Sequence, residues 1–369
     1  MEKPLISFVI LSYNHELYIS EAIYSALAQT YNPLEIVISD DCSSDNSFHI
    51  IKKICSSYVG PHSLLINCNP MNLGIGGNVN KAMDGCHGQL IVVAGGDDIS
   101  LPERTEVIYE AWEKTGRRAT SIFSNYFIIG KDGESQGLGG LRSAEGYYCQ
   151  DLKHSGSESA DTPHGSGRIR IFEGNIYDFL SKRQPVVNGC SHAWSRELFD
   201  QFGQLSSDLE DLVLTFRTLS IGQILYIDTP LLKYRRHGNN LSFLAERDDT
   251  LTFEHREERL RWVDEQTVKA YSNIIMDIDT LSQKNKISSS YHKQLITEAK
   301  RVRDFYDIER QMMDGGFLHK LLILMKFAKQ GKIKLALRFA VRLLPKRIYR
   351  QLYIQRERWR TLCCLLQCR

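Results

Sequence analysis

Short blocks of apolar, often β-branched residues recur through the first 130 positions of the chain. Blocks of this kind are typical of strands buried on both faces of a parallel sheet, and they predict strands over residues 5–11, 35–39, 63–68, 90–94 and 121–129. Residues 16–29, which separate the first two blocks, carry apolar side chains at the three-and-four spacing of an amphipathic helix. Because strands and helices alternate, the pattern predicts an α/β fold with a parallel, doubly wound sheet.

The regular alternation ends after residue 130. Residues 131–167 are rich in glycine and serine and predict a long loop, which we expect to lie beside a ligand site. A strand is predicted over residues 186–194 and a short strand over residues 224–227. From Ala245 onward strong helix formers dominate and long amphipathic helices are predicted. We therefore expect an α/β domain over residues 1–245 and a C-terminal α-helical region over residues 246–369.

Polar side chains follow three of the predicted strands, where each strand ends: Tyr13 and Asn14, Asp40 and Asp41, and Asp97 and Asp98. In a right-handed α/β sheet these strand ends share one edge, and that edge is where such folds bind ligands. Two adjacent carboxylates repel each other unless a cation or a set of hydrogen bonds offsets the charge. The sequence therefore predicts a ligand site at this edge that includes a metal ion, with helix capping as the alternative role for the last pair.

A glycine-rich turn, Gly74-Ile75-Gly76-Gly77, precedes the fourth predicted strand. It invites comparison with a dinucleotide-binding loop, but the third glycine of that motif would fall at Val79. The motif therefore fails, and the segment predicts only a turn into a short helix.

The net charge of +2 conceals a strong asymmetry. Residues 317–369 contain fourteen Lys and Arg and one acid, Glu357, a net +13, so the remainder of the chain carries −11. A basic, amphipathic tail of this kind predicts contact with an anionic membrane surface, and packing on the α/β domain is the alternative. No signal peptide or membrane-spanning run is evident, and nine cysteines without a CxxC pair predict reduced thiols in a cytosolic protein.

Taken together, five segments resemble the motifs of inverting family-2 glycosyltransferases of the GT-A type, which build bacterial surface polysaccharides. They are residues 11–14 (Leu-Ser-Tyr-Asn), 40–45 (Asp-Asp-Cys-Ser-Ser-Asp), 96–98 (Gly-Asp-Asp), 209–211 (Leu-Glu-Asp) and 234–242 (Tyr-Arg-Arg-His through Asn240 and Ser242). The resemblance covers residues 4–242 and implies a GT-A fold, Rossmann-like with a mostly parallel sheet. Gly96 stands where the family's metal motif has its first aspartate.

The resemblance implies a role for each polar residue at the sheet edge. Tyr13, Asn14, Asp40, Asp41 and Asp97 would bind the donor nucleotide, with Tyr13 on the base face. One of the aspartates, Asp41, would accept the imide proton of a uracil or thymine base, while Asp97 would reach the ribose.

The metal and the acceptor have their own candidate residues. Asp98 and His237 would hold Mn²⁺ or Mg²⁺, since oxygen ligands suit both ions and an imidazole favours manganese. Asp211 would be the general base that takes the acceptor's hydroxyl proton. Further candidates near the acceptor, in contact with it or behind the contacting residues, are His192, Trp194, Glu210 and Arg236.

The expected function is transfer of a sugar from a UDP- or dTDP-sugar to a hydroxyl of a glycan or lipid-linked acceptor, in O-antigen or capsule biosynthesis. The enzyme would be cytoplasmic and peripheral on the inner face of the cell membrane. A nucleotidyltransferase is one alternative, although residues 12–15 lack the basic, glycine-rich loop of that class. A non-catalytic nucleotide-sugar-binding protein is another. No nucleic-acid motif accompanies the basic tail, so no nucleic-acid partner is expected.

Overall fold

The computed structural model describes residues 2–140, 169–172, 174–182, 189–238, 240, 252–330, 333–344, 348 and 351. Most of the loop predicted over 131–167 and nearly all of the tail beyond residue 344 lie outside these ranges. By packing, the chain divides into one unit of residues 1–241 with 269–301 and a second unit of residues 242–268 with 302–369. The predicted boundary at residue 245 stays a prediction, and residues 269–301 group with the sheet.

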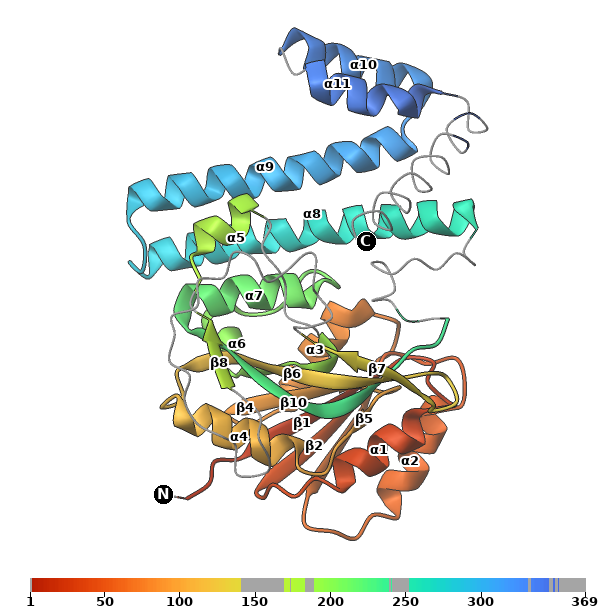
Figure 1. Ribbon diagram of the computed structural model, residues 1–369, viewed down its shortest axis with the longest axis vertical. Coiled ribbons are helices and arrows are strands. Elements are labelled where there is room, and N and C mark those ends of the chain that lie inside the picture. The colour runs from red at the N-terminus through yellow and green to blue at the C-terminus, as the bar shows by residue number, and fades with distance from the viewer. Residues whose placement is uncertain are drawn as a thin grey trace, which may run out of the picture. The chain divides into compact units, whose positions relative to one another are not determined.

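A ten-stranded sheet forms the first unit, with helices on both faces (Figure 1). Its strands are β1 Ile6–Ser12, β2 Leu34–Asp40, β3 Ser63–Cys68, β4 Leu90–Gly95, β5 Ile99–Ser100, β6 Ala119–Ile129, β7 Ser135–Gly139, β8 Ile169–Phe172, β9 Ala193–Ser195 and β10 Gln223–Arg235. The order along the main path is β3-β2-β1-β4-β9-β6-β10-β5. The strands from β3 to β4 pair in parallel, whereas the short β9 is antiparallel to both neighbours. The predicted α/β class is confirmed.

The helices also follow the predicted alternation, and a helical region follows the sheet as expected. They are α1 Ile19–Leu27, α2 Ser47–Ser56, α3 Gly74–Asp84, α4 Arg104–Lys114, α5 Ile176–Lys182, α6 Glu197–Phe202, α7 Glu210–Ile221, α8 Phe253–Gln283, α9 Ser289–Asp314, α10 Phe317–Lys329 and α11 Ile333–Ala340, with 3₁₀ turns η2 Gly189–Ser191 and η4 Val341–Leu343.

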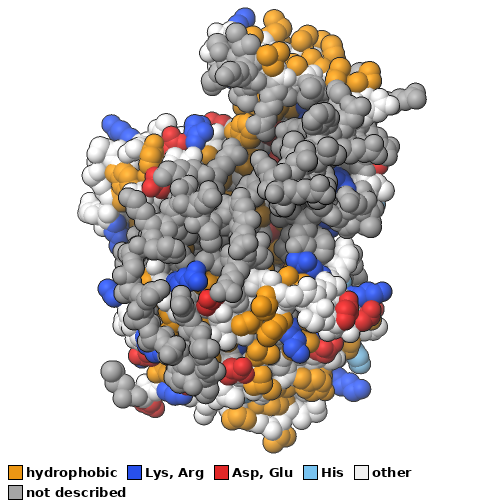
Figure 2. Space-filling model, in the orientation of Figure 1, with side chains coloured by type: hydrophobic (Ala, Val, Ile, Leu, Met, Phe, Trp, Pro, Cys, Tyr) orange, Lys and Arg blue, Asp and Glu red, His pale blue; other side chains and the backbone are white. Residues whose placement is uncertain are grey.

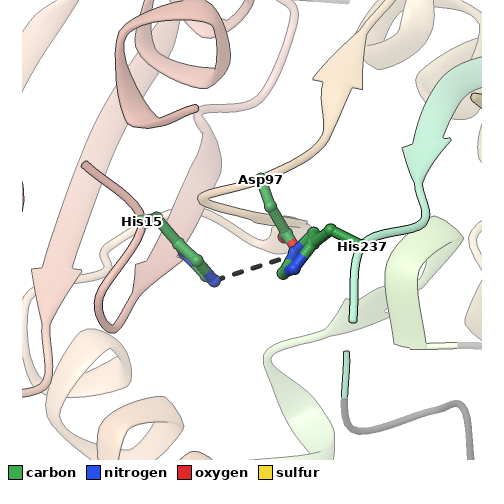
Figure 3. A group of neighbouring side chains, drawn as sticks. All are labelled: His15, Asp97 and His237. Atoms are coloured by element: carbon green, nitrogen blue, oxygen red, sulfur yellow. Dashed lines mark hydrogen bonds and ion pairs between the residues drawn. The ribbon is translucent and has the colours of Figure 1, made fainter. Parts of the chain in front are cut away.

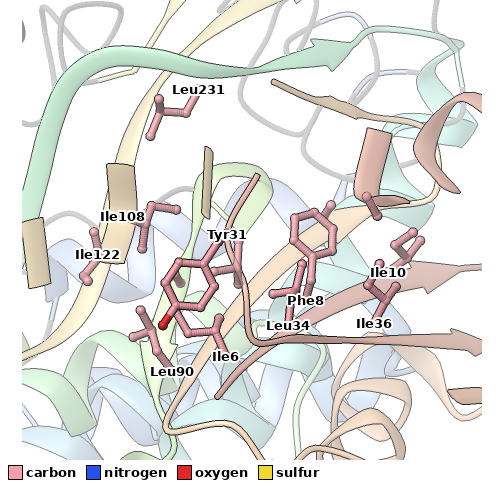
Figure 4. Packing of buried hydrophobic residues seen from close by; sticks show 14 of the residues in the cluster. Ile6, Phe8, Ile10, Tyr31, Leu34, Ile36, Leu90, Ile108, Ile122 and Leu231 are labelled. Atoms are coloured by element: carbon pink, nitrogen blue, oxygen red, sulfur yellow. The ribbon is translucent and has the colours of Figure 1, made fainter. Parts of the chain in front are cut away.

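Burial on both faces explains why the central strands read as continuous apolar runs. Along β1, Ile6, Phe8 and Ile10 point into a core shared with α1, α2 and α4 (Figure 4). Val9 points the other way, into a core formed with α3, α6 and α7. Side chains alternate between the faces of a strand, so both faces needed apolar residues. The sheet is thereby fixed from both sides, and its strand ends are held at constant positions.

Two predicted boundaries are wrong. The expected short strand at 224–227 is the beginning of β10, which continues to Arg235 because register shifts around Pro230 let the strand pass the proline. Within the predicted strand at 186–194, Gly189–Ser191 form a 3₁₀ turn and β9 begins only at Ala193. Part of the predicted loop is also a strand, since β7 pairs with β6.

A buried ion pair attaches the second half of α8 to the sheet domain. Nε and Nη2 of Arg217, on α7, donate to the two carboxylate oxygens of Asp277 at 2.8 and 3.2 Å, and both side chains are almost fully buried. Further donations from Arg217 reach the carbonyls of Phe202, Gly203 and Gln204. A buried pair with this many hydrogen bonds makes residues 269–301 part of the α/β unit.

Removing one member of this pair should unfold the domain more readily. Asp277→Ala leaves the Arg217 guanidinium buried without a counter-charge, and we expect the free energy of unfolding to fall by about 3–5 kcal/mol in urea titrations. Asp84→Ala, which breaks the exposed pair with Lys81, is the matched control and should change little. The double variant Arg217→Met, Asp277→Leu should regain most of the loss, and equal stability of Asp277→Ala and the control would contradict the assignment.

The second unit has a small core of its own. Met312, Leu324, Phe327 and Phe339 pack together, with the ring centroids of the two phenylalanines 5.9 Å apart. The outward side of α10 is also apolar: Phe317, Leu318, Leu321, Leu322 and Met325 are 36–74% exposed, and we call them the α10 apolar face. Figure 2 shows hydrophobic side chains gathered over α10 and α11. Among the described helices, none combines the length and apolar character needed to cross a bilayer.

Candidate active site

The predicted edge of the sheet carries a cluster of three side chains of the types that can bind a metal ion. His15 follows β1, Asp97 follows β4 and His237 follows β10, and Figure 3 shows the three side chains converging. One ligand atom from each lies within 4.8 Å of the others. The strands bring together residues that are more than 200 positions apart, so the sheet itself builds this site.

Asp97 is the centre of the cluster. Its Oδ2 accepts hydrogen bonds from His237 Nε2 at 2.9 Å and Asn240 Nδ2 at 3.2 Å, and His15 Nε2 lies 3.9 Å away. Burial alone would raise the pKa of Asp97, but the His237 hydrogen bond and the nearby imidazoles outweigh it and lower the pKa. Nδ1 of His15 is buried without a hydrogen-bond partner. An ionised carboxylate between two imidazoles is a donor set that suits a divalent transition metal.

Asp98 has different surroundings from those expected of a metal ligand. Its side chain is 2% exposed, and its Oδ1 accepts the backbone N–H of Arg235 at 3.0 Å. Burial, and then the charge of Asp97, raise the pKa of Asp98 well above its ordinary value. Arg235 also donates from Nε to the Asp97 carbonyl and from Nη2 to Glu21. Asp98 therefore anchors the end of β10 to the end of β4, and its role as a metal ligand stays a prediction.

The predicted nucleotide residues lie on neighbouring loops of the same edge. Oδ1 of Asn14, a residue with φ of 55°, accepts the N–H of Ser44 at 2.8 Å, which ties the loop after β1 to the loop after β2. Asp40 is buried and accepts the hydroxyls of Ser12 and Ser43. Tyr13 is 45% exposed, so its ring remains available to a ligand.

Asp41 binds the glycine-rich turn rather than facing open solvent. Its carboxylate accepts the N–H groups of Leu73 and Gly74, each at 2.9 Å, and the side chain of Asn69. Gly74 has φ of +76°, which a residue with a side chain rarely adopts. The glycine-rich turn, which failed as a dinucleotide-binding motif, therefore serves to hold Asp41 at the sheet edge.

Two acids begin α7, as expected, and they lie against Gly189. The backbone N–H of Gly189 donates to Oδ2 of Asp211 at 3.0 Å. A side chain at Gly189 would place its Cβ 3.0 Å from both Oδ1 of Asp211 and Oε1 of Glu210, so a larger residue would require the two carboxylates to shift. Burial raises the pKa of Asp211 to about 7, against the Gly189 hydrogen bond. Burial and the charge of Asp211 raise the pKa of Glu210 well above its ordinary value.

Two of the other acceptor-side candidates lie behind the surface. His192 and Trp194 are 0% and 2% exposed, so neither reaches an acceptor from solvent in this structure. Trp194 packs against His192 and Phe199, with ring centroids 5.2 and 6.1 Å away. Arg236 donates its backbone N–H to the carbonyl of Ile129 at 2.7 Å.

The η2 turn lies close to both groups of carboxylates. Burial raises the pKa of the Cys190 thiol, and the charges of Asp98, Asp211 and Asp97 raise it further. A buried guanidinium, that of Arg104, donates to the carbonyls of Val93 and Cys190 and to Ser100. All three carboxylates thus act electrostatically on a single turn of the chain.

Sequence reasoning did not choose His15 or Arg235 as candidate site residues, and it placed Asn240 in the closing motif without giving it a role. The first of these directly follows two residues that were singled out at the end of β1, so its position alone was a usable signal. Arg235 lies within the segment Tyr-Arg-Arg-His, where its neighbours His237 and Arg236 were chosen instead.

Comparison with known proteins indicates the family of the chain. Residues 7–177 match the family described as Glycosyl transferase family 2. An uncharacterized glycosyltransferase of Nostoc sp. is 33% identical over 239 residues, 64% of this chain and 66% of the relative. Another, of Rickettsia felis, is 27% identical over 238 residues, 64% of this chain. The match spans about a third of the Rickettsia protein, 35% of its length.

Among solved structures, S. aureus TarS in complex with UDP-GlcNAc is similar, with a TM-score of 0.45 and 16% identity over 94% of this chain and 91% of that chain. The mostly parallel sheet with helices on both faces, followed by a helical region, is the GT-A arrangement predicted from the sequence. The chain belongs to glycosyl transferase family 2.

Proposed function

We propose that this protein is an inverting, metal-dependent glycosyltransferase. It transfers a sugar from a nucleoside-diphosphate donor, of the UDP or dTDP class, to a hydroxyl of a glycan or lipid-linked acceptor in cell-surface polysaccharide synthesis. The observation that carries the proposal is the convergence of His15, Asp97 and His237 at the sheet edge, beside the loops of Asp40 and Asp41 and near the carboxylates that begin α7. Family membership supports the same reaction class.

The donor would bind across the loops after β1 and β2. Tyr13 offers an exposed ring for the base, and Asn14 and Asp40 keep the two loops joined. The glycine-rich turn holds the Asp41 carboxylate in a fixed orientation. A base N–H would donate to the lone pairs of this carboxylate that remain free. Preorganised hydrogen-bonding groups of this kind reduce the cost of ordering on binding.

His15, Asp97 and His237 would hold a divalent cation. The fit rests on the convergence of the ligand atoms, with Oδ2 of Asp97 lying 2.9 Å from Nε2 of His237 and 3.9 Å from Nε2 of His15. Such a cation supplies Lewis-acid neutralisation of the charge that develops on a departing diphosphate. Two imidazoles and one carboxylate favour Mn²⁺ over Mg²⁺, which prefers oxygen ligands throughout.

Asp211 would act as the general base. Its near-neutral pKa suits a group that must be ionised at working pH and still accept a proton. The acceptor hydroxyl loses its proton to Asp211 as its oxygen attacks the anomeric carbon. Attack on the face opposite the diphosphate inverts the anomeric configuration.

The test of the proposed function is a panel of nucleotide sugars, each incubated with the full chain and Mn²⁺. Release of nucleoside diphosphate by one or a few donors, dependent on the cation and on a glycan acceptor, is the expected result. Binding of a donor with no turnover under any acceptor would favour a non-catalytic binding protein. Release of inorganic pyrophosphate when a nucleoside triphosphate and a sugar phosphate are supplied instead would indicate a nucleotidyltransferase.

The location is proposed from the helical unit, which fits an anionic lipid surface as a peripheral contact on the inner face of the cell membrane. Residues 317–344 contain seven Lys and Arg and no acid. The α10 apolar face provides five exposed apolar side chains on that same segment. An apolar helix face with basic neighbours is the pattern of helices that lie in a membrane interface, and the charge complements anionic headgroups rather than another basic surface.

We predict that the full chain sediments with vesicles containing phosphatidylglycerol and that high salt weakens the binding without abolishing it. Each Lys or Arg near such a surface is worth about 1 kcal/mol, and burial of the α10 apolar face supplies the salt-resistant part. Leu318→Glu with Leu322→Glu should reduce partitioning at least about tenfold, because it places two charges in the apolar contact.

The matched control is Val59→Glu with Met276→Glu, which adds the same charge at two exposed apolar positions of the sheet unit. This control should bind vesicles like the unmodified chain. Equal loss in both double variants would mean that net charge alone governs binding. Unchanged binding of the α10 variant would remove this face from the proposal.

A further inference from the structure

Behind Asp211, three polar side chains from three parts of the sequence form a line. The Thr218 hydroxyl, on α7, donates to Oγ of Ser121 on β6 at 2.8 Å. Oγ of Ser121 lies 2.7 Å from Nε2 of His192, just before β9. Nδ1 of His192 then faces Oδ1 of Asp211 at 3.9 Å. Ser121, His192 and Thr218 are fully buried, so water does not compete along this line.

The hydrogen bonds of Ser121 can hold His192 in the tautomer that carries its proton on Nδ1. Ser121 receives the Thr218 proton, so its own hydroxyl proton is free to be donated to Nε2. The imidazole is neutral, because burial and the charge of Arg104 lower the pKa of His192 to about 3. A neutral imidazole that accepts at Nε2 carries its proton on Nδ1. In this tautomer the Nδ1–H of His192 points at Asp211.

The two facing atoms are both unsatisfied. His192 Nδ1 and Asp211 Oδ1 are buried and have no hydrogen-bond partner in the structure. A buried donor and a buried acceptor each cost free energy when left unpaired, and a native structure rarely keeps two of them face to face without a reason. The gap of 3.9 Å exceeds a normal hydrogen bond by about 1 Å, which a small rotation of the carboxylate closes.

We propose that His192 is a positioning residue for Asp211, which donates its Nδ1–H to Oδ1 and, together with the Gly189 N–H on Oδ2, fixes the orientation of the carboxylate that receives the acceptor's proton. Ser121 and Thr218 hold the imidazole in the tautomer that this requires. The inference rests on the proposed role of Asp211 as general base. It gives His192 a function that does not need contact with the acceptor.

The hydrogen bond also opposes the effect of burial on Asp211. A donor to the ionised form stabilises it, so His192 keeps the carboxylate available as a base near neutral pH. The charged and titratable groups around the pair are Glu210 and Asp208 beside α7, Cys190 on the η2 turn and Arg104 on α4. The charge of Asp211 raises the pKa of both Glu210 and the Cys190 thiol, and Glu210, the other carboxyl group, needs its own control.

The direct test uses ¹⁵N-histidine-labelled full chain and no substrate. The chain has eleven histidines, and the signals of His192 are those missing from His192→Gln. We expect a neutral Nδ1–H tautomer from about pH 5 to 8, with Nδ1 shifting as Asp211 ionises near neutral pH. That shift should vanish in Asp211→Asn and persist in Glu210→Gln. An Nε2–H tautomer, or a shift that survives in Asp211→Asn, would overturn the proposal.

Two substitutions separate the two ends of the imidazole. The amide group of asparagine falls near the Nδ1 position of histidine, and that of glutamine falls near the Nε2 position. His192→Gln keeps the contact with Ser121 but loses the donor to Asp211, so the acidic limb of the turnover–pH profile should move up by about one unit or more, with donor KM unchanged. His192→Asn keeps that donor and should leave the limb within a few tenths of a unit.

The outcomes distinguish this inference from the proposed function. Full turnover in Asp211→Asn would contradict the base role, and the positioning role with it. Loss of turnover in Asp211→Asn together with an unmoved pH limb in His192→Gln would contradict the positioning role alone. If both His192 variants lower the melting temperature equally and neither moves the limb, the histidine is structural and the proposal is wrong.

Discussion

Asp97→Asn should lower the affinity for Mn²⁺ at least about 10²-fold and reduce transfer to background. The substitution removes the negative charge that lies between His15 and His237. Loss of a residue that only supports a metal ligand already lowers metal affinity or activity by about 10- to 100-fold, so loss of the carboxylate ligand should cost at least as much. Calorimetric titration of the free protein with MnCl₂ measures the affinity, and nucleoside diphosphate release measures transfer. His237→Ala should weaken both less severely, because two ligands remain.

The neighbouring carboxylate provides the control for this prediction. In Asp98→Asn the amide oxygen can still accept the Arg235 N–H, so Mn²⁺ affinity should change by less than about tenfold. The opposite ranking, with Asp98→Asn losing the metal and Asp97→Asn keeping it, would restore the assignment made from the sequence motif. Melting temperatures of both variants show whether either loss is simply a loss of fold.

Asp211→Asn should lower turnover by about 10²- to 10⁴-fold with little change in donor affinity, because asparagine keeps the shape of the side chain but cannot take a proton. In the unmodified protein, turnover should rise with pH and level off above the Asp211 pKa of about 7, since only the ionised carboxylate is a base. A pH series of single turnovers with saturating donor measures this limb. Loss of donor affinity at unchanged turnover would assign Asp211 to binding.

The same group should affect stability with the opposite sign. The folded-state pKa of about 7 lies above the ordinary value of 3.8, so the folded protein binds this proton more tightly than the unfolded chain does. The stabilisation is complete below pH 3.8 and is lost as the pH rises toward 7. In urea titrations, Asp211→Asn should therefore show a smaller loss of stability across this window than the unmodified protein.

Much of the fold was readable from the sequence because it depends on local pattern. A strand buried on both faces needs a continuous apolar run, and β1, β2 and β4 have one. Because the crossover connections between parallel strands are right-handed, the polar residues at the ends of these strands share one edge of the sheet. The placement of Tyr13, Asp40 and Asp97 on neighbouring loops follows from these two facts.

Segment boundaries were less accessible where the backbone departs from regular geometry. Pro230 reads as a stop in the sequence, yet the register shifts of β10 around this residue allow the strand to continue. The helices after Ala245 read as one appendage, yet Asp277 pairs with Arg217 inside the sheet domain. Periodicity describes a helix face but does not say which partner covers that face.

The sequence by itself determined the fold class, the family and the edge of the sheet where chemistry gathers, because periodicity and strand-end residues are local properties. Only the tertiary structure decided which of two adjacent aspartates meets His15 and His237, and which way His192 points. Asp97 and Asp98 are the same type of residue at adjacent positions. Their opposite surroundings come from β10, whose backbone N–H at Arg235 binds Asp98 and whose next turn delivers His237 to Asp97. Contacts between residues about 140 positions apart leave no trace in a local pattern.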